Sequence, residues 1–343
     1  IFSRPGITPI DDAVKLENLT RAEKPLSIIY YDPEAEDPLK INPEKPVILQ
    51  GGNVKNCSGV IFHGIYFRGG MLRVIESSDI TLNECEFSDF EGPAVRAWDV
   101  DRFTAQDCLC ANRIKSDKDS GCFVIEAIRD KQSEDCRIVG NVILNAGDGI
   151  GLPWGTVKKE YLQTGNPDYM HEHDRVGELP GLLIAWNVIQ TTEEYYTNDG
   201  TTACGEDAID IKNRGTKEKP IVVRNNIMGG QRRADQSCGG TGGGTVITVH
   251  ENAAFVEILD NVFEDANVGM TVWSGKHEDI KLNYVSDIVI RDNVFRDFKN
   301  FFGPEYANAQ GRAIRLSNKF FKDDKFRGII IEGNEFSQCQ EGY

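Results

Sequence analysis

The stretch Ile288-Val-Ile-Arg-Asp-Asn293-Val-Phe295 contains the pattern that decides the fold. An apolar run leads into an asparagine, and further apolar residues follow it. The same phrase returns around five other asparagines: Asn141, Asn187, Asn226, Asn261 and Asn334. Less regular copies occupy residues 60–67 and 80–87, and successive asparagines are 32 to 46 residues apart. A phrase that recurs in this way is typical of a repeat protein, in which each unit packs on its neighbours.

A second short strand lies between consecutive copies of the phrase. Examples are residues 93–97, 148–152, 207–212, 245–250, 268–273 and 312–316. No segment with a helical period separates them, so each repeat is expected to be a coil of strands that stacks on the next coil. Asparagine suits a fixed corner of a coil because it tolerates left-handed backbone and its amide can bond to the neighbouring coil. The alternative, a β-sandwich, would show hairpin turns instead of a repeated asparagine corner.

These repeats resemble the right-handed parallel β-helices of the pectin-lyase type. We therefore predict an all-β chain with a single domain, in which a right-handed parallel β-helix (a pectin-lyase-like solenoid) covers residues 46–343. Residues 1–45 are expected to cap its first coil, since the open ends of a solenoid need cover. Long loops are expected over the middle coils, at residues 153–180, 191–205 and 229–244. Binding sites usually form where such loops lie over a rigid scaffold.

The composition narrows the possible partners. The chain has 343 residues, with 38 Lys and Arg against 54 Asp and Glu, and a formal net charge of −16. This charge argues against nucleic acid and anionic membranes as partners, because both need a basic surface. No apolar run reaches the length of about 18 residues that a membrane-spanning helix needs. A polyanionic substrate would therefore require a local cationic patch or a bound cation.

The cysteines indicate the compartment. Nine cysteines without a zinc-type Cys-x2-Cys pair favour disulfides and an oxidising environment. We expect a secreted protein, extracellular or periplasmic, which is monomeric and was processed at its N-terminus, because the chain starts at Ile1 without a leader. Cys204 and Cys238 lie in long loops of consecutive coils and are candidates for a disulfide. The alternative is a set of buried thiols that stack as small apolar residues.

Side chains along a β-strand alternate between the inside and the outside of the coil. In the second strand of each repeat, this alternation places candidate functional side chains in outward columns. In the strand at 207–212 the isoleucines point inward, so Asp210 and Lys212 point outward. Applied to the next three coils, this rule gives an outward column of Lys212, His250, Trp273 and Ser317. A neighbouring outward column contains Asp210, Thr248, Thr271 and Arg315. Since adjacent coils lie about 4.8 Å apart, Lys212 and His250 are expected to be neighbours.

These side chains form a workable set for β-elimination from a uronic acid, which removes the C5 proton beside a carboxylate and breaks the C4–O bond. The reaction needs positive charge on the carboxylate, a base, and a proton donor for the leaving oxygen. Lys212 can be the base if its pKa is lowered, and His250 suits the donor. Three acids offer oxygen ligands for Ca²⁺: Glu206, Asp207 and Asp210. The candidates for substrate contact are Arg315, Trp273, Arg233, Arg96 and His173.

The stretch Gly205-Glu-Asp207-Ala-Ile-Asp-Ile-Lys212-Asn213 resembles the site of the family 6 polysaccharide lyases, the group of alginate lyases and chondroitinase B. In that family an acidic pair holds calcium, and a lysine follows the second acid by five positions, as Lys212 follows Asp207. The resemblance therefore implies that Asp207 binds calcium and that Lys212 is the base. The strand at 244–250 is similar to the family's next coil, and His250 stands where the family has an arginine that acts on the leaving group.

Together these observations predict a lyase that cleaves an acidic, uronate-containing polysaccharide with the help of Ca²⁺. Three alternatives compete with this function, and the sequence disfavours the third. A polyuronate C5-epimerase shares the first half of the chemistry, and a non-catalytic glycan-binding or adhesin β-helix needs no Lys–His column. A β-helical hydrolase of the polygalacturonase type would carry Asn-Thr-Asp and Gly-His-Gly signatures, which are absent from this sequence.

Overall fold

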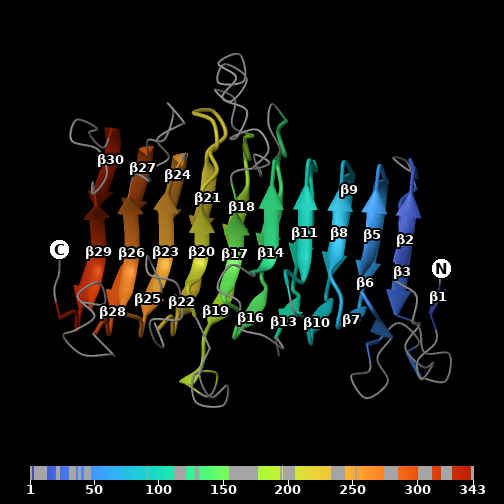
Figure 1. Ribbon diagram of the computed structural model, residues 1–343, viewed down its shortest axis with the longest axis horizontal. Helices are drawn as coiled ribbons and strands as arrows, with labels where there is room; N and C mark the ends of the chain where they lie inside the picture. The colour runs from blue at the N-terminus through green and yellow to red at the C-terminus, as the bar shows by residue number, and fades with distance from the viewer. Residues whose placement is uncertain are drawn as a thin grey trace, which may run out of the picture.

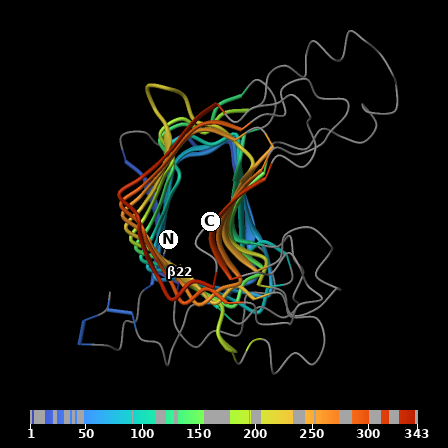
Figure 2. The same ribbon diagram turned by 90° about the vertical axis from the view of Figure 1, so that its left-hand side faces the viewer.

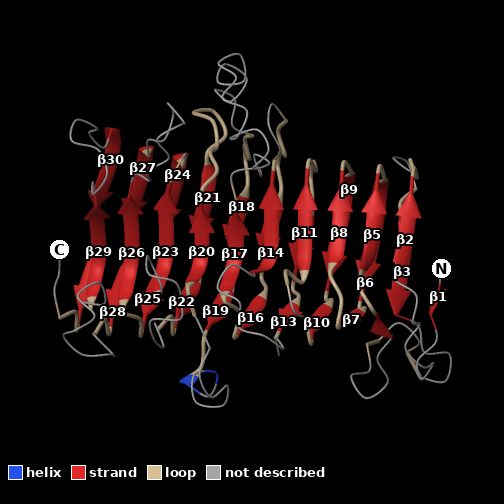
Figure 3. Ribbon diagram, in the orientation of Figure 1, coloured by secondary structure: helices blue, strands red, loops and turns tan. Residues whose placement is uncertain are grey.

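The chain forms a right-handed parallel β-helix in the computed structural model, which confirms the predicted fold (Figure 1). The structure describes residues 2–3, 14–20, 24–30, 36–37, 40–41, 48–90, 92–111, 121–127, 131–153, 177–193, 195, 205–232, 244–251, 253–273, 285–299, 311–317 and 327–340. Strands and turns make up nearly all of this part of the chain (Figure 3). Within it, no helix is long and apolar enough to cross a membrane.

Three parallel sheets, here named A, B and C, form the walls of the solenoid (Figure 2). Sheet A contains β1 (Phe2–Ser3), β3 (Leu26–Tyr30), β6 (Ser58–His63), β9 (Ser78–Asn83), β12 (Thr104–Gln106), β15 (Arg137–Val139), β18 (Leu183–Ala185), β21 (Ile221–Arg224), β24 (Ala254–Leu259), β27 (Ser286–Arg291) and β30 (Arg327–Glu332). Sheet B contains β4 (Ile48–Leu49), β7 (Tyr66–Arg68), β10 (Glu86–Ser88), β13 (Leu109–Cys110), β16 (Val142–Leu144), β19 (Val188–Gln190), β22 (Ile227–Gly229), β25 (Val262–Glu264), β28 (Val294–Arg296) and β31 (Glu335–Ser337).

Sheet C carries the second strand of each predicted repeat. It contains β2 (Val14–Glu17), β5 (Gly52–Lys55), β8 (Leu72–Ile75), β11 (Val95–Trp98), β14 (Gly121–Glu126), β17 (Asp148–Leu152), β20 (Asp207–Ile211), β23 (Thr245–His250), β26 (Val268–Trp273) and β29 (Arg312–Ser317). A typical coil runs from a strand of sheet C to one of sheet A and then to one of sheet B, and the next coil repeats this order. The asparagine phrase of the sequence is the A-to-B part of the coil.

The segment predicted as the cap, residues 1–45, contributes strands to the sheets. β2 pairs with β5 in sheet C, and β3 pairs with β6 in sheet A. β1 and β2 are edge strands at the N-terminal end of their sheets. Within the described part of this segment, the strands therefore continue the solenoid and form its N-terminal edge, and the boundary at residue 45 stays a prediction.

The predicted asparagine ladder lies at the corner between sheets A and B. The backbone N and the Nδ2 of Asn226 both donate to the Oδ1 of Asn261, at 3.0 and 2.9 Å. The same pair of bonds links the other consecutive members, from Asn141 through to Asn334. The left-handed backbone, however, belongs to the residue before each ladder asparagine, for example Asn225 with φ 55°. The asparagine therefore stabilises the corner through the hydrogen bonds of its side-chain amide and not through left-handed backbone.

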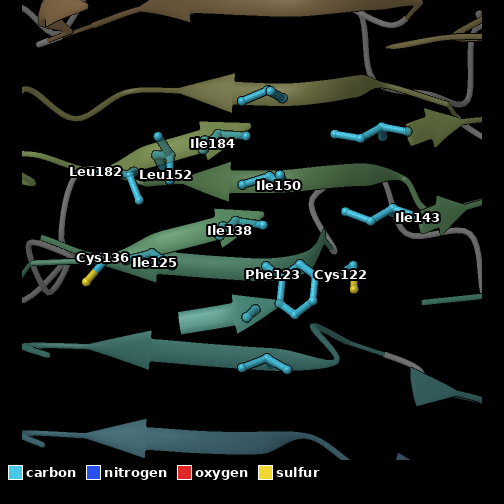
Figure 4. Close-up of a cluster of buried hydrophobic side chains, with 14 of the residues drawn as sticks. Cys122, Phe123, Ile125, Cys136, Ile138, Ile143, Ile150, Leu152, Leu182 and Ile184 are labelled. Atoms are coloured by element: carbon cyan, nitrogen blue, oxygen red, sulfur yellow. The ribbon is translucent and has the colours of Figure 1, made fainter. Parts of the chain in front are cut away.

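The interior is a continuous apolar core that runs along the solenoid axis, and Figure 4 shows one part of it around Phe123. Inward side chains of equal position stack from coil to coil, as Phe263 and Phe295 do with ring centroids 4.5 Å apart. Because each coil buries its apolar face only against the next coil, this stacking supplies the stability that no single coil has.

Both predicted uses of cysteine occur. Cys110 and Cys122 form a disulfide between β13 and β14. Four further thiols are buried: Cys57, Cys85, Cys108 and Cys136. Cys108 occupies the ladder position of its coil, and its backbone N donates to the Oδ1 of Asn141 at 2.9 Å. The predicted pair Cys204 and Cys238 lies outside the described residues.

Candidate functional site

The strand register of sheet C confirms the two predicted columns. Asp210 pairs with Thr248, Thr248 with Thr271, and Thr271 with Arg315. In the second column His250 pairs with Trp273, and Trp273 with Ser317. The pairing of Ile211 with Val249 places Lys212 beside His250, one coil apart. Alternation predicted this part of the site correctly because the inward isoleucines anchor the strand in the core.

Asp210 is the centre of the site. Its Oδ2 lies 2.6 Å from the Lys212 Nζ, and its Oδ1 lies 2.8 Å from the His250 Nε2. Both Asp210 and His250 are buried, with 7% of each exposed. The carboxylate therefore holds an ammonium group and an imidazole on the same outward face of the sheet.

The electrostatics of this cluster are set by the ion pair. Burial alone would raise the pKa of Asp210, but His250 and Lys212 lower it to about 2. Burial acts on Lys212 in the opposite direction, yet the charge of Asp210 and its hydrogen bond outweigh it and raise the pKa of the lysine. A lysine base needs a lowered pKa, so this arrangement does not supply the condition on which the predicted base role depends. It presents Lys212 as a cation.

Trp273 covers the imidazole from the next coil. The rings of His250 and Trp273 stack with centroids 4.7 Å apart and an interplanar angle of 24°. On the other side of the imidazole, the Nδ1 lies 3.7 Å from the Oε1 of Glu251. The stacking and the bond to Asp210 together fix the orientation of the ring.

Asp207 adds a second carboxyl group to the site. Strict alternation would point its side chain inward with Ile209 and Ile211, but in the structure it points outward. Its Oδ1 accepts a bond of 2.6 Å from the Thr248 Oγ1, so its side chain points outward with Asp210. Ala208 and Ile209 are both in the core, so the strand departs from strict alternation at this point. Burial, followed by the charges of Asp210, Asp148 and Glu206, raises the pKa of Asp207 well above its usual value.

Asp148 is the member of this group that the sequence analysis missed. It pairs with Asp207 in the register of sheet C and is itself buried. The signal available in the sequence was its position at the start of the strand at 148–152, which matches that of Asp207 in the next coil.

The predicted calcium ligands are Glu206, Asp207 and Asp210. Among the described residues, no three His, Cys, Asp or Glu side chains are arranged to hold a metal ion. Asp210 is a poor ligand in this arrangement because both of its oxygens accept bonds from Lys212 and His250. Calcium binding by Glu206, Asp207 and Asp210 stays a prediction.

The predicted substrate contacts are spread along the face of sheet C. Arg315 is three coils beyond Asp210 in its own column, and burial followed by the charge of Arg312 lowers its pKa. Arg96 lies three coils to the other side. Its guanidinium is paired with the buried Glu126 at 2.8 Å and lies over the Trp98 ring. Arg233 and His173 lie outside the described residues.

Comparisons with known proteins show the fold. No family model and no curated protein matches the sequence. A structure of the surface adhesin PfbA from Streptococcus pneumoniae is 13% identical, with a TM-score of 0.60 over 100% of this chain and 90% of that chain. A second PfbA structure is 11% identical, with a TM-score of 0.51 over 96% of this chain and 72% of that one.

Two polysaccharide-related structures are less similar. The A-module of a mannuronan C-5 epimerase from Azotobacter vinelandii is 12% identical, with a TM-score of 0.49 over 99% of this chain and 87% of that chain. A PL6 alginate lyase in complex with a trisaccharide is 14% identical, with a TM-score of 0.42 over 89% and 64% of the two chains. The likeness to the two PfbA structures shows a shared β-helix fold, and membership of the lyase family stays a prediction.

Proposed function

We propose that this protein is a polysaccharide lyase that acts on a uronate-containing polysaccharide at the outward face of sheet C. The observation that carries the proposal is the cluster of Lys212, Asp210 and His250, which has Trp273 stacked on its imidazole. Elimination from a uronic acid requires a cation for the carboxylate and a group that moves the proton, and Lys212 and His250 can supply these. The Trp273 ring can pack on a sugar. The disulfide fits a secreted protein, because such bonds persist in oxidising compartments.

The ion pair suggests how the roles are divided. In the proposed reaction the C5–H bond breaks, a C4=C5 double bond forms, and the C4–O bond breaks with transfer of a proton to the leaving oxygen. Lys212, kept cationic by Asp210, would stabilise the negative charge that develops on the uronate carboxylate. His250, held at Nε2 by Asp210, would accept the C5 proton through its other ring nitrogen and then donate it to the leaving oxygen. This division differs from the sequence prediction, in which Lys212 is the base.

The activity is tested with alginate, pectate, chondroitin sulfate and glucuronan as substrates. Elimination creates an unsaturated uronate, whose ultraviolet absorbance should rise with time. No rise with any of these polymers would contradict the proposal. A rise that is insensitive to a chelator would exclude a calcium requirement but leave the lyase activity in place.

Substitution of Lys212 separates its two possible roles. Arginine keeps the positive charge but does not release its proton, whereas alanine removes both functions. If Lys212 is a cation, Lys212→Arg should keep a measurable part of the activity and Lys212→Ala should lose on the order of 100-fold or more. Equal loss in both variants would assign the base to Lys212 instead.

The same assay in deuterated water distinguishes the alternatives. Exchange of the C5 hydrogen with solvent, without an absorbance increase, would identify an epimerase. Binding of an acidic polysaccharide with neither signal would identify a non-catalytic glycan-binding protein.

A further inference from the structure

A tryptophan occupies a left-handed corner position that bulky residues avoid. Trp186 has φ 56° and comes directly before the ladder residue Asn187. In the other coils of the ladder the equivalent residues are Gly140, Asn225, Asp260, Asp292 and Gly333, all of them types that tolerate this backbone. Packing does not explain the exception, because 54% of Trp186 is exposed. An exposed aromatic ring at a strained position points to a function for the ring.

Arg224 of the following coil lies over this ring. Its guanidinium carbon is 5.2 Å from the centroid of the Trp186 ring, within the range of a cation–π contact. Several other arginines on this solenoid pair with acids, as Arg102 does with Asp79 and Arg296 with Glu264. Among the described residues the guanidinium of Arg224 has no acidic partner, and its Nε is buried without a hydrogen bond. It is an uncompensated cation on a chain whose net charge is −16.

Apolar side chains extend the surface beside the tryptophan. Val142, Val188 and Ile227 follow one another in the outward column of sheet B. The described residues include five large, exposed hydrophobic side chains, and three of them, Val142, Trp186 and Ile227, lie at this corner. Every residue of these A-to-B corners is described by the structure. Apolar surface that stays exposed in a group, beside a free cation, is typical of a binding surface.

We propose that Trp186, Arg224 and the adjoining Val188 and Ile227 form a second glycan-binding site, separate from the site on sheet C. The apolar face of a sugar ring would pack on the exposed part of the indole and on the valine–isoleucine surface. A carboxylate or sulfate of the same chain would accept hydrogen bonds from Arg224. The ligand class, an acidic polysaccharide, rests on the proposed function, whereas the site itself rests on the corner geometry.

The position of this site defines its role. It lies where sheet A meets sheet B, on β18, β19, β21 and β22, whereas Lys212 and His250 extend from sheet C (Figures 1 and 2). A polymer bound at the corner would therefore be held to the enzyme without occupying the catalytic site on sheet C. This arrangement would keep the protein on a long or insoluble substrate between reaction events.

The test counts binding sites in the full chain. Oligosaccharides from alginate, pectate and chondroitin sulfate are titrated by calorimetry into the Lys212→Ala variant, which blocks turnover. We expect two molecules bound per chain for the recognised oligosaccharide, and one after addition of either Trp186→Asn or Arg224→Gln. Asparagine is chosen because Asn225 fills the same corner in the next coil. The control is Ile330→Asn, a substitution at a residue that is 48% exposed on sheet A, which should leave both sites intact.

The outcomes separate this site from the proposed lyase. The corner variants are Trp186→Asn and Arg224→Gln in the Lys212→Ala chain. Loss of one binding site in these variants supports the corner site, whether or not the wild-type chain has lyase activity. Unchanged stoichiometry in both corner variants overturns it. Sedimentation of the parent and the Trp186→Asn variant adds a second criterion: a dimer that becomes a monomer, without any change in glycan binding, would show that the corner joins two copies of the chain and would also overturn the proposal.

Discussion

Single buried amides at the A-to-B corner satisfy several backbone groups at once. Asn261 accepts two bonds from Asn226 through its Oδ1, and its Nδ2 donates to the carbonyls of Val223 and Leu259. Alanine at this position would leave these buried groups unpaired, so we expect Asn261→Ala to lower the free energy of unfolding by about 3 kcal/mol or more. Urea denaturation measures the difference.

The neighbouring asparagine gives a matched control. Asn225 is exposed and belongs to the corner only through its left-handed backbone, with φ 55°. Asn225→Ala should therefore lose only about 1 kcal/mol, the usual cost of that conformation for a residue with a Cβ. Equal losses in the two variants would show that the amide ladder contributes little to stability.

The two central carboxyl groups should respond oppositely to pH. The raised pKa of Asp207 means that the folded state holds its proton more tightly than the unfolded chain does. Its favourable contribution is complete below the unfolded pKa, about 3.9, and is lost as the pH rises through the folded value. Asp207→Asn keeps the acceptor for Thr248, so it should stabilise the protein at pH 7 and have little effect at pH 3.

Asp210 provides the opposite case. Its pKa is lowered to about 2, so its contribution is present above a pH of about 4 and is lost as the pH falls towards 2. Asp210→Asn should therefore destabilise the protein at pH 7 and do so progressively less in acid. Unfolding by urea at pH 3 and pH 7 compares both variants. A gain in stability from both substitutions at pH 7 would contradict the assigned ion pair.

At the level of strands, the sequence predicted the coils and the outward columns correctly, because repetition and strict alternation determine these features. The repeated phrase predicted the coils, and alternation placed His250, Trp273 and Ser317 in one column. Alternation failed at Ala208 and Ile209, which both point into the core and turn Asp207 outward. A local departure of this kind depends on how neighbouring coils pack, which a single strand does not reveal. For the same reason the ion pair that raises the pKa of Lys212 was not foreseen.

The disulfide links two strands that are consecutive in sequence but belong to different sheets. Cys110 ends β13 and Cys122 lies in β14, and they are separated by 12 positions. A loop of this length loses about 3 kcal/mol of stability when its cross-link is opened, on the chain-entropy model. The Cys110→Ser/Cys122→Ser double variant and the reduced wild type should therefore unfold at similarly lower urea concentrations. A reductant that further destabilised the double variant would point to another disulfide in the chain.

For the whole molecule, part of the acidic charge that gives the net −16 lies at the left-handed corners. Left-handed corner positions favour aspartate, asparagine and glycine, so acids recur at equivalent places on adjacent coils. Glu84 and Asp107 are such neighbours, since the residues before them, Asn83 and Gln106, are paired in sheet A. Among the described ion pairs, neither has a cationic partner. Like charges at a spacing of about 4.8 Å repel each other, and the repulsion is screened as the ionic strength rises.

Salt should therefore stabilise this protein. The Debye length falls from about 30 Å at 0.01 M to about 8 Å at 0.15 M, so the Tm should rise over this range. Glu84→Gln combined with Asp107→Asn changes the net charge from −16 to −14, and it should raise the Tm at low salt and reduce the response to salt. Asp79→Asn is the control, because Asp79 has a left-handed φ of 55° but is bonded to Arg102 at 2.6 and 2.9 Å. If Asp79→Asn raised the Tm at low salt as much as the double variant, total charge rather than its arrangement at the corners would govern stability.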